Sequence, residues 1–292
     1  MKRIIQTVLA VFCCCLLQGC FHQKADVKVA ATTAPIYEFT ARICNGTDIS
    51  VGRIITENVS CLHDYTLQTS QMRMIENAEL VIISGAGLED FISDVLTTSE
   101  MIIDASESVT LICSESDHEH AHNEHTHTHD PHIWLSPENA SQMATNICNG
   151  LKAAYPQHAD EFDANLIVLL DKLSALTEYG KKQLQSLNSR QLITFHDGFT
   201  YFAEAFDLEI LYAIEEEAGS EAPASELIKI CQAIETNRIP AIFTEQSGST
   251  SASRIISSET GAEIYQLDMA MSDNGYFTAM YNNINAIKEA LE

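Results

Sequence analysis

Apolar residues alternate along the chain between short runs, typical of buried strands, and longer stretches in which they recur at helical spacing. The short runs predict strands at residues 27–33, 49–55, 80–84, 101–104, 191–195, 209–213, 241–244 and 264–267. Helical spacing predicts helices at residues 36–44, 70–78, 88–96, 136–155, 158–187, 225–237, 249–260 and 276–291, and a further helix that includes residues 203–206. Ser70 is the candidate N-cap of the second of these helices. Strands and helices that alternate in this way predict parallel α/β sheets.

The predicted helix near the middle of the chain divides this pattern into two halves. It is far longer than an average helix of about 11–12 residues, and the α/β alternation restarts after it. We therefore expect two similar α/β lobes with parallel sheets, joined by one long rigid helix. Because ligands of open α/β sheets lie outside the carboxyl ends of the strands, the expected metal site lies in the interlobe cleft. The predicted organisation is an N-terminal lobe at residues 21–155, a linking helix at 156–189 and a C-terminal lobe at 190–292.

Residues 1–20 have the features of a targeting segment. Lys2 and Arg3 precede an apolar stretch at residues 4–17, which is too short for a transmembrane helix. The stretch ends at residues 17–20 (LQGC), which resemble the lipobox of bacterial lipoproteins and make Cys20 the expected acylated residue. The alternative is an ordinary cleaved signal. Either one predicts export to the periplasm or the cell surface, and no later stretch is apolar enough to span a membrane, which leaves the lipid as the only anchor.

The net charge indicates which partners the protein can bind, and the cysteine content indicates whether disulfides are expected. The chain carries 16 Lys and Arg against 41 Asp and Glu, for a formal net charge of -25. Such a surface repels nucleic acid and attracts cations, although solubility alone also accounts for acidity. The cysteines beyond the targeting segment are odd in number and include no C-x-x-C pair, so we expect small core residues, with a pair between Cys44 and Cys61 left open.

Four polar residues occupy places where predicted strands end or turns begin. His63 follows the second strand, His196 follows strand 191–195, Asp268 follows strand 264–267, and His132 lies in a turn. Three imidazoles and one carboxylate form a tetrahedral set suited to Zn²⁺. A single histidine is more often a surface or hydrogen-bonded residue, so the prediction depends on the set.

A second candidate metal site is a histidine-rich tract between residues 117 and 130. Its composition has no place in a hydrophobic core, and neutral imidazoles on a loop bind metal weakly at several sites. A pH-responsive solvated loop and low-complexity drift are the alternatives. The histidines of the tract are His118, His120, His122, His125, His127 and His129.

Several segments together resemble the metal-specific solute-binding proteins of bacterial ABC importers, and in particular the zinc branch of that family. The segments are residues 63–65 (HDY), 82–89 (IISGAGLE), 130–137 (DPHIWLSP), 194–201 (TFHDGFTY), 222–227 (APASEL), 243–245 (FTE), 259–262 (ETGA) and 267–268 (LD). The resemblance implies one metal between two lobes, held by His63, His132, His196 and Asp268. Glu245 is a candidate outer-shell group or an alternative carboxylate ligand, and Asp197 and Asp64 are candidates to orient their neighbouring imidazoles. The chain departs from the family pattern at residues 66–70 and 246–248, so the resemblance says less about the rim of the cleft and the partner surface than about the ligands.

The same resemblance implies the function. The expected role is capture of Zn²⁺ outside the cytoplasm and delivery to an ABC permease and its ATPase, by a protein that is monomeric and anchored through lipid only. A manganese- or iron-binding homologue, and a surface adhesin or metal buffer on the same scaffold, are the alternatives. A zinc hydrolase is disfavoured, because a catalytic zinc keeps an open position for water, whereas a full tetrahedral set of protein ligands is available here. The protein is therefore predicted not to be an enzyme.

Overall fold

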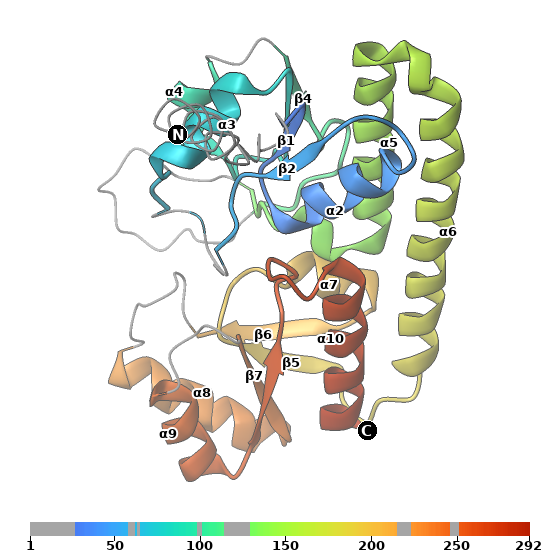
Figure 1. Cartoon of the computed structure of the whole chain (residues 1–292). Coiled ribbons are helices and arrows are strands. Elements are labelled where there is room, and N and C mark those ends of the chain that lie inside the picture. Colours follow the sequence, from blue (N-terminus) through green and yellow to red (C-terminus); the bar gives the residue numbers. More distant parts are fainter. Residues whose placement is uncertain are drawn as a thin grey trace, which may run out of the picture.

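The computed structural model describes residues 27–57, 62, 65–97, 101–113, 129–214, 223–245 and 251–292. Within these residues the strands form two four-stranded parallel sheets, one from each half of the chain (Figure 1). The predicted α/β class is confirmed. In the described part of the chain, no helix is both long and apolar enough to cross a membrane.

The first sheet has the strand order β2-β1-β3-β4. Its central strand pairs in parallel on both sides, with Val29 opposite Val51 and Leu80. The strands are β1 (Val29–Ala31), β2 (Val51–Arg53), β3 (Leu80–Ile83) and β4 (Ile102–Asp104). The helices of this lobe are α2 (Ala34–Ile43), α3 (Thr69–Asn77), the 3-10 helix η1 (Asp90–Ile92) and α4 (Ser93–Leu96).

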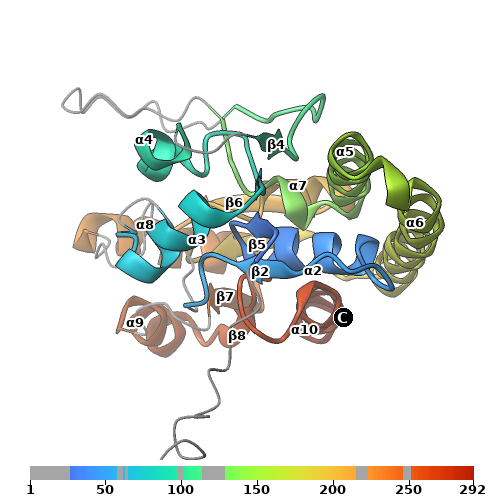
Figure 2. The ribbon, with the colours of Figure 1, turned by 45° about the horizontal axis from the view of Figure 1, so that its top comes forward.

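The second sheet repeats this arrangement with the strand order β6-β5-β7-β8. Helices α8 and α9 lie on the side of this lobe that faces away from α6 in both Figure 1 and Figure 2. The strands are β5 (Gln191–Thr194), β6 (Glu209–Ala213), β7 (Ala241–Glu245) and β8 (Glu263–Leu267). The helices are α7 (Thr200–Ala205), α8 (Ala224–Asn237), α9 (Ser251–Thr260) and α10 (Tyr276–Leu291).

Two antiparallel helices lie side by side, and the second of them packs against both lobes. The first, α5 (Pro137–Ala154), begins at Ser136, whose hydroxyl accepts a hydrogen bond from the backbone N–H of Asn139, and the 3-10 helix η3 (Pro156–His158) follows it. Helix α6 (Ala159–Gln183) has 25 residues and packs against α2 and α5 of the first lobe and α10 of the second (Figure 1). The predicted long linking helix is thus present, although it ends four residues earlier than helical spacing indicated.

The hydrophobic core is continuous between the lobes. One cluster of buried side chains includes Phe39 and Leu80 of the first lobe together with Phe202, Leu267 and Ile284 of the second. A smaller cluster fills the space between the second sheet and α8 and α9. A shared core of this kind opposes a wide hinge motion, since opening would expose apolar surface to water.

Two local predictions are wrong. Ser70 does not cap α3; the helix begins after Gln68, whose side chain forms a reciprocal capping box with Gln71. The segment predicted as helix 88–96 is helical only from Asp90, first as a 3-10 turn and then as a single α-helical turn. The cause is the side chain of Glu89, which bends back to accept hydrogen bonds from the backbone of Ser84 and Gly85.

Candidate metal centre

His132 is held by the turn that precedes α5. Its Nδ1 lies 2.8 Å from Oδ1 of Asp130, and its backbone N–H donates to the same oxygen at 2.9 Å. The hydroxyl of Tyr201 donates to the Asp130 backbone carbonyl at 2.9 Å, which ties this turn to the second lobe. An imidazole that donates through Nδ1 to a carboxylate presents the lone pair of Nε2, as histidine ligands of metals commonly do.

His196 follows β5 at the carboxyl end of the second sheet. Its backbone carbonyl accepts a hydrogen bond from the Thr194 hydroxyl at 3.0 Å, and its Nδ1 lies 3.8 Å from Oε1 of Glu245 at the end of β7. Both His196 and Glu245 are buried. Glycine is required two residues later, because a Cβ at Gly198 would lie 2.6 Å from Cδ2 of His196 and 2.7 Å from Cε of Met269.

The two histidines meet between the lobes. Their Nε2 atoms are 3.3 Å apart, and each residue is only 4% exposed. At Zn–N distances of about 2.0–2.1 Å, a tetrahedral angle places two ligand nitrogens about 3.3–3.4 Å apart. The observed separation of the two imidazole nitrogens therefore fits a shared tetrahedral metal ion.

Asp268 lies at the carboxyl end of β8, and the structure does not bring its carboxylate to the histidine pair. Its Oδ1 accepts from the Ala270 N–H at 2.8 Å and its Oδ2 from the Ser272 hydroxyl at 3.2 Å. The backbone carbonyl of the next residue, Met269, accepts a hydrogen bond from Trp134 Nε1 at 2.8 Å. Among the described residues, no group of three or more His, Cys, Asp or Glu is arranged to hold a metal ion.

The remaining predicted site residues fall in several places. His63 and Asp64 lie outside the described residues. Asp197 is exposed. His129 is described and pairs with Cys113 in an isolated antiparallel bridge. The other histidines of the tract, His118, His120, His122, His125 and His127, also lie outside the described residues, as does Cys20. Cys44 is a buried free thiol.

Sequence reasoning missed Asp130 as the residue that orients His132. The signal was available in the Asp-Pro-His spacing, because a carboxylate two residues before a histidine reaches both its backbone N–H and its ring. The buried Trp134 was also missed as a link between lobes: its ring N–H contacts Met269, and its carbonyl accepts from the Tyr276 hydroxyl at 2.9 Å.

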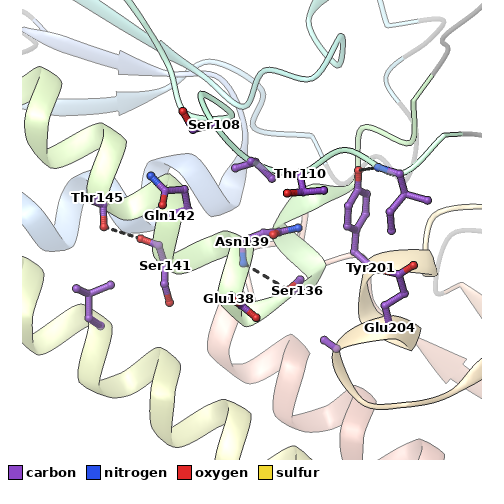
Figure 3. A pocket seen from close by; sticks show the side chains of 14 residues that line it. Ser108, Thr110, Ser136, Glu138, Asn139, Ser141, Gln142, Thr145, Tyr201 and Glu204 are labelled. Atoms are coloured by element: carbon purple, nitrogen blue, oxygen red, sulfur yellow. Dashed lines mark hydrogen bonds between the residues drawn. The ribbon is translucent and has the colours of Figure 1, made fainter.

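A separate cavity of about 640 Å³ lies where α5, α7 and the loop after β4 meet (Figure 3). Hydroxyl, amide and carboxylate side chains line it, including Ser136, Asn139, Tyr201 and Glu204. Neither His132 nor His196 borders this cavity. The interlobe histidine pair is thus distinct from this cavity. The imidazoles of the pair are suitable ligands for a metal ion.

The fold is that of a two-lobed α/β protein, with a histidine pair between the lobes whose spacing fits a metal ion. The model of one protein family, described as ZnuA, zinc-uptake complex component A, periplasmic, matches residues 29–290. The chain belongs to this family.

The chain is similar to proteins that are named for zinc binding. It is 26% identical over 312 residues to the zinc-binding lipoprotein AdcA of Streptococcus pneumoniae serotype 4, and the match covers 100% of the chain and 62% of that relative. The chain thus spans about three fifths of the length of that relative. A crystal structure of ZnuA superposes with a TM-score of 0.80 at 26% identity, covering 91% of this chain and 100% of that one.

A third likeness concerns the fold alone. The laminin-binding protein Lmb of Streptococcus agalactiae, described as bifunctional with adhesin and metal-transporting activity, superposes with a TM-score of 0.79 at 22% identity. The match covers 90% of this chain and 98% of Lmb.

Proposed function

We propose that the protein is the extracytoplasmic zinc-binding component of an ABC-type zinc importer, which captures Zn²⁺ and delivers it to a permease and its ATPase. The observation that carries the proposal is the 3.3 Å separation of the His132 and His196 Nε2 atoms, one from each lobe. Family membership and the zinc-binding relatives support the choice of cargo. Imidazole nitrogen is a preferred ligand of zinc, whereas manganese prefers harder oxygen ligands.

The proposed ligand set is His63, His132, His196 and Asp268. The 3.3 Å separation of the His132 and His196 Nε2 atoms supports two of these ligands, and Asp268 would join them by giving up its hydrogen bonds with Ala270 and Ser272. Glu245 and Asp130 are proposed to orient the imidazoles through their Nδ1 atoms. We propose no catalytic step, because the zinc ion is cargo and a complete protein ligand set leaves no position for a reacting water.

Capture then follows from simple coordination chemistry. Zn²⁺ exchanges its water ligands for groups from both lobes, and the bridge stabilises the closed arrangement. The shared core around Trp134 and Tyr276 limits the accompanying motion to a small tilt or a local loop movement. Delivery requires that docking on the permease disturbs the ligand set.

The experiment that tests this function measures growth and metal content together. Cells without this protein are expected to stop growing under zinc chelation and to recover with added zinc, and the purified protein is expected to hold one tightly bound zinc. Recovery with manganese alone would reject the zinc assignment. The adhesin and metal-buffer alternatives rest on likeness of fold, and no feature of the described residues favours either.

The histidine-rich tract is proposed as a weak, separate set of sites. Deletion of residues 117–129 is expected to leave one tight zinc site and to remove the weaker ones, because His132 is positioned by Asp130 and Tyr201 and not by the tract. Titration calorimetry of the two proteins measures both classes of site. Loss of the tight site on deletion would make the tract a source of primary ligands.

Anchoring is proposed to occur through a lipid on Cys20, with the folded part monomeric outside the cytoplasm. Replacement of Cys20 with serine is expected to shift the exported protein from the detergent phase to the aqueous phase, or to leave the precursor uncleaved. Phase partitioning and immunoblotting of cell fractions measure the change. A variant that still partitions into detergent at the mature size would exclude this anchor.

A further inference from the structure

Cys113 and His129 lie directly opposite each other, at the two ends of the segment that contains most of the histidine-rich tract. The two residues form an isolated antiparallel bridge. The backbone hydrogen bond beside the bridge joins their neighbours, since the N–H of Asp130 donates to the carbonyl of Ile112 at 3.0 Å. Cys113 and His129 therefore form a non-hydrogen-bonded pair, in which Cα atoms lie about 4.5 Å apart and side chains come closest together.

This geometry brings a thiol and an imidazole within reach of one metal ion. Side chains of such a pair project from the same face, with Cβ atoms about 4.5–5.5 Å apart. A tetrahedral zinc ion with sulfur at about 2.3 Å and nitrogen at about 2.0–2.1 Å holds these two ligand atoms about 3.5 Å apart. Cys113 is an exposed free thiol and His129 is partly buried, so a cation from solvent reaches the sulfur.

A buried tyrosine of the second lobe holds the backbone on both sides of the pair. The Tyr201 hydroxyl accepts a hydrogen bond from the Ile112 N–H at 3.0 Å and donates one to the Asp130 carbonyl at 2.9 Å. Tyr201 is 3% exposed, and burial raises the pKa of its hydroxyl to about 12, so the group remains a donor at neutral pH. Backbone that is already ordered lowers the entropic cost of bringing two ligands to one ion.

We propose that Cys113 and His129 form a second metal site, in which a thiolate and an imidazole bind one soft or borderline cation such as Zn²⁺. The thiol loses its proton as the metal binds. Thiolate and imidazole together favour zinc or copper(I) over magnesium and manganese. The site goes beyond the proposed function, because it requires neither the interlobe histidines nor delivery to a permease.

A purely structural bridge is the competing explanation. In that case the two side chains are neighbours only because the backbone is paired, and metal ions leave the thiol unchanged. The other histidines of the tract are a further source of ligands. The test therefore has to separate the pair from these histidines as well as from the interlobe site.

The test uses Co²⁺ as a spectroscopic substitute for Zn²⁺, titrated into the reduced, metal-free protein. Cobalt bound to a thiolate gives a charge-transfer band in the near ultraviolet that nitrogen and oxygen ligands do not give. Because the proposed interlobe ligands are nitrogen and oxygen, the band reports the cysteine site alone. Cys113→Ser and His129→Ala are compared with the wild type, and the control is Cys231→Ser, which removes another free thiol, in α8. A further variant replaces the other five histidines of the tract with alanine: His118, His120, His122, His125 and His127.

The band is expected in the wild type, in the control and in the variant without the five histidines. Cys113→Ser is expected to lose the band, and His129→Ala is expected to need about tenfold more Co²⁺ to reach half of it. In the wild type, Zn²⁺ is expected to slow alkylation of Cys113 by iodoacetamide, located by mass spectrometry, and to leave that of Cys231 unchanged.

Three results would overturn the proposal. They are a band that survives Cys113→Ser, an unchanged midpoint in His129→Ala, and loss of the band with the five histidines, which would move the ligands into the tract. His196→Ala is expected to keep the band while it loses the tight zinc site. A wild type that shows the band but binds no zinc tightly would contradict the proposed function and support the second site.

Discussion

Replacing His196 with alanine is expected to weaken zinc binding by at least about 100-fold, which corresponds to about 2.7 kcal/mol. The reason is geometric. The Nε2 atoms of His196 and His132 are 3.3 Å apart and both residues are buried, so loss of either imidazole removes one of the proposed ligands from the space between the lobes. His132→Ala is expected to have an effect of similar size.

Competition with a fluorescent zinc chelator measures the loss, with His158→Ala as the control. His158 is also an imidazole with a carboxylate partner, Asp48, at 2.8 Å, but it lies in η3 at the start of the linking helix. Its removal is expected to leave zinc affinity unchanged. Equal affinities for wild type and His196→Ala would remove the interlobe pair from the ligand set.

The same position is expected to control metal choice. His196→Glu retains a ligand but exchanges nitrogen for carboxylate oxygen, which harder ions prefer. Zinc affinity is therefore expected to fall less than in His196→Ala, while discrimination against Mn²⁺ relaxes. Titrating both metals against the three proteins separates the two effects, and an unchanged zinc-to-manganese ratio in His196→Glu would contradict the argument.

Much of the fold could be predicted because the periodic signal in this chain is strong. Strand 209–213 and helix 276–291 have the predicted bounds, and the other strands differ by no more than a few residues at either end. The prediction from apolar spacing was wrong where a side-chain interaction determines the local backbone conformation. Residues 88–96 have helical apolar spacing, but the Glu89 carboxyl turns back to the β3–η1 turn, in which Gly85, Ala86 and Gly87 all have positive φ.

The candidate site was predictable in part. His132 and His196 were chosen because each lies at a turn or a strand end, and the structure brings these two together. Their separation could not be obtained from sequence, since it depends on how the two lobes pack around Trp134 and Tyr276. The position of the Asp268 carboxylate could not be obtained from sequence either. Two donors in its own loop, the Ala270 N–H and the Ser272 hydroxyl, bind it there. The role of the complete set of four therefore stays a prediction.

Glu89 is expected to make the stability of the metal-free protein fall as pH rises through the range from 4.5 to about 7. The residue is 3% exposed, and burial raises the pKa of its carboxyl from 4.5 to about 7, against three hydrogen bonds that favour the ionised form. The donors are the Thr32 hydroxyl at 2.6 Å and the backbone N–H groups of Ser84 and Gly85 at 2.7 and 3.0 Å. Together they join the carboxyl ends of β1 and β3 at the edge of the cleft.

The sign follows from proton binding. Between pH 4.5 and about 7 the folded state holds the Glu89 proton more tightly than the unfolded state does, so raising the pH favours unfolding in this window. The stability contributed by the protonated carboxyl is fully present below pH 4.5 and is lost by about pH 7, a change of about 3 kcal/mol. The glutamine in Glu89→Gln cannot ionise, so this pH-dependent contribution to the free energy of unfolding is absent from the variant. Any other difference in stability between the two proteins is the same at every pH.

Urea unfolding of wild type and Glu89→Gln at pH 4.5, 6.0 and 7.5, with metal removed by a chelator, isolates the contribution of this one carboxyl. All other titrating groups are common to the two proteins, so they cancel in the difference between the two free energies of unfolding. That difference is expected to move in favour of the glutamine variant by about 3 kcal/mol between the lowest and highest pH. Parallel pH profiles would mean that the donors from Thr32, Ser84 and Gly85 offset the cost of burial and keep the carboxyl ionised throughout.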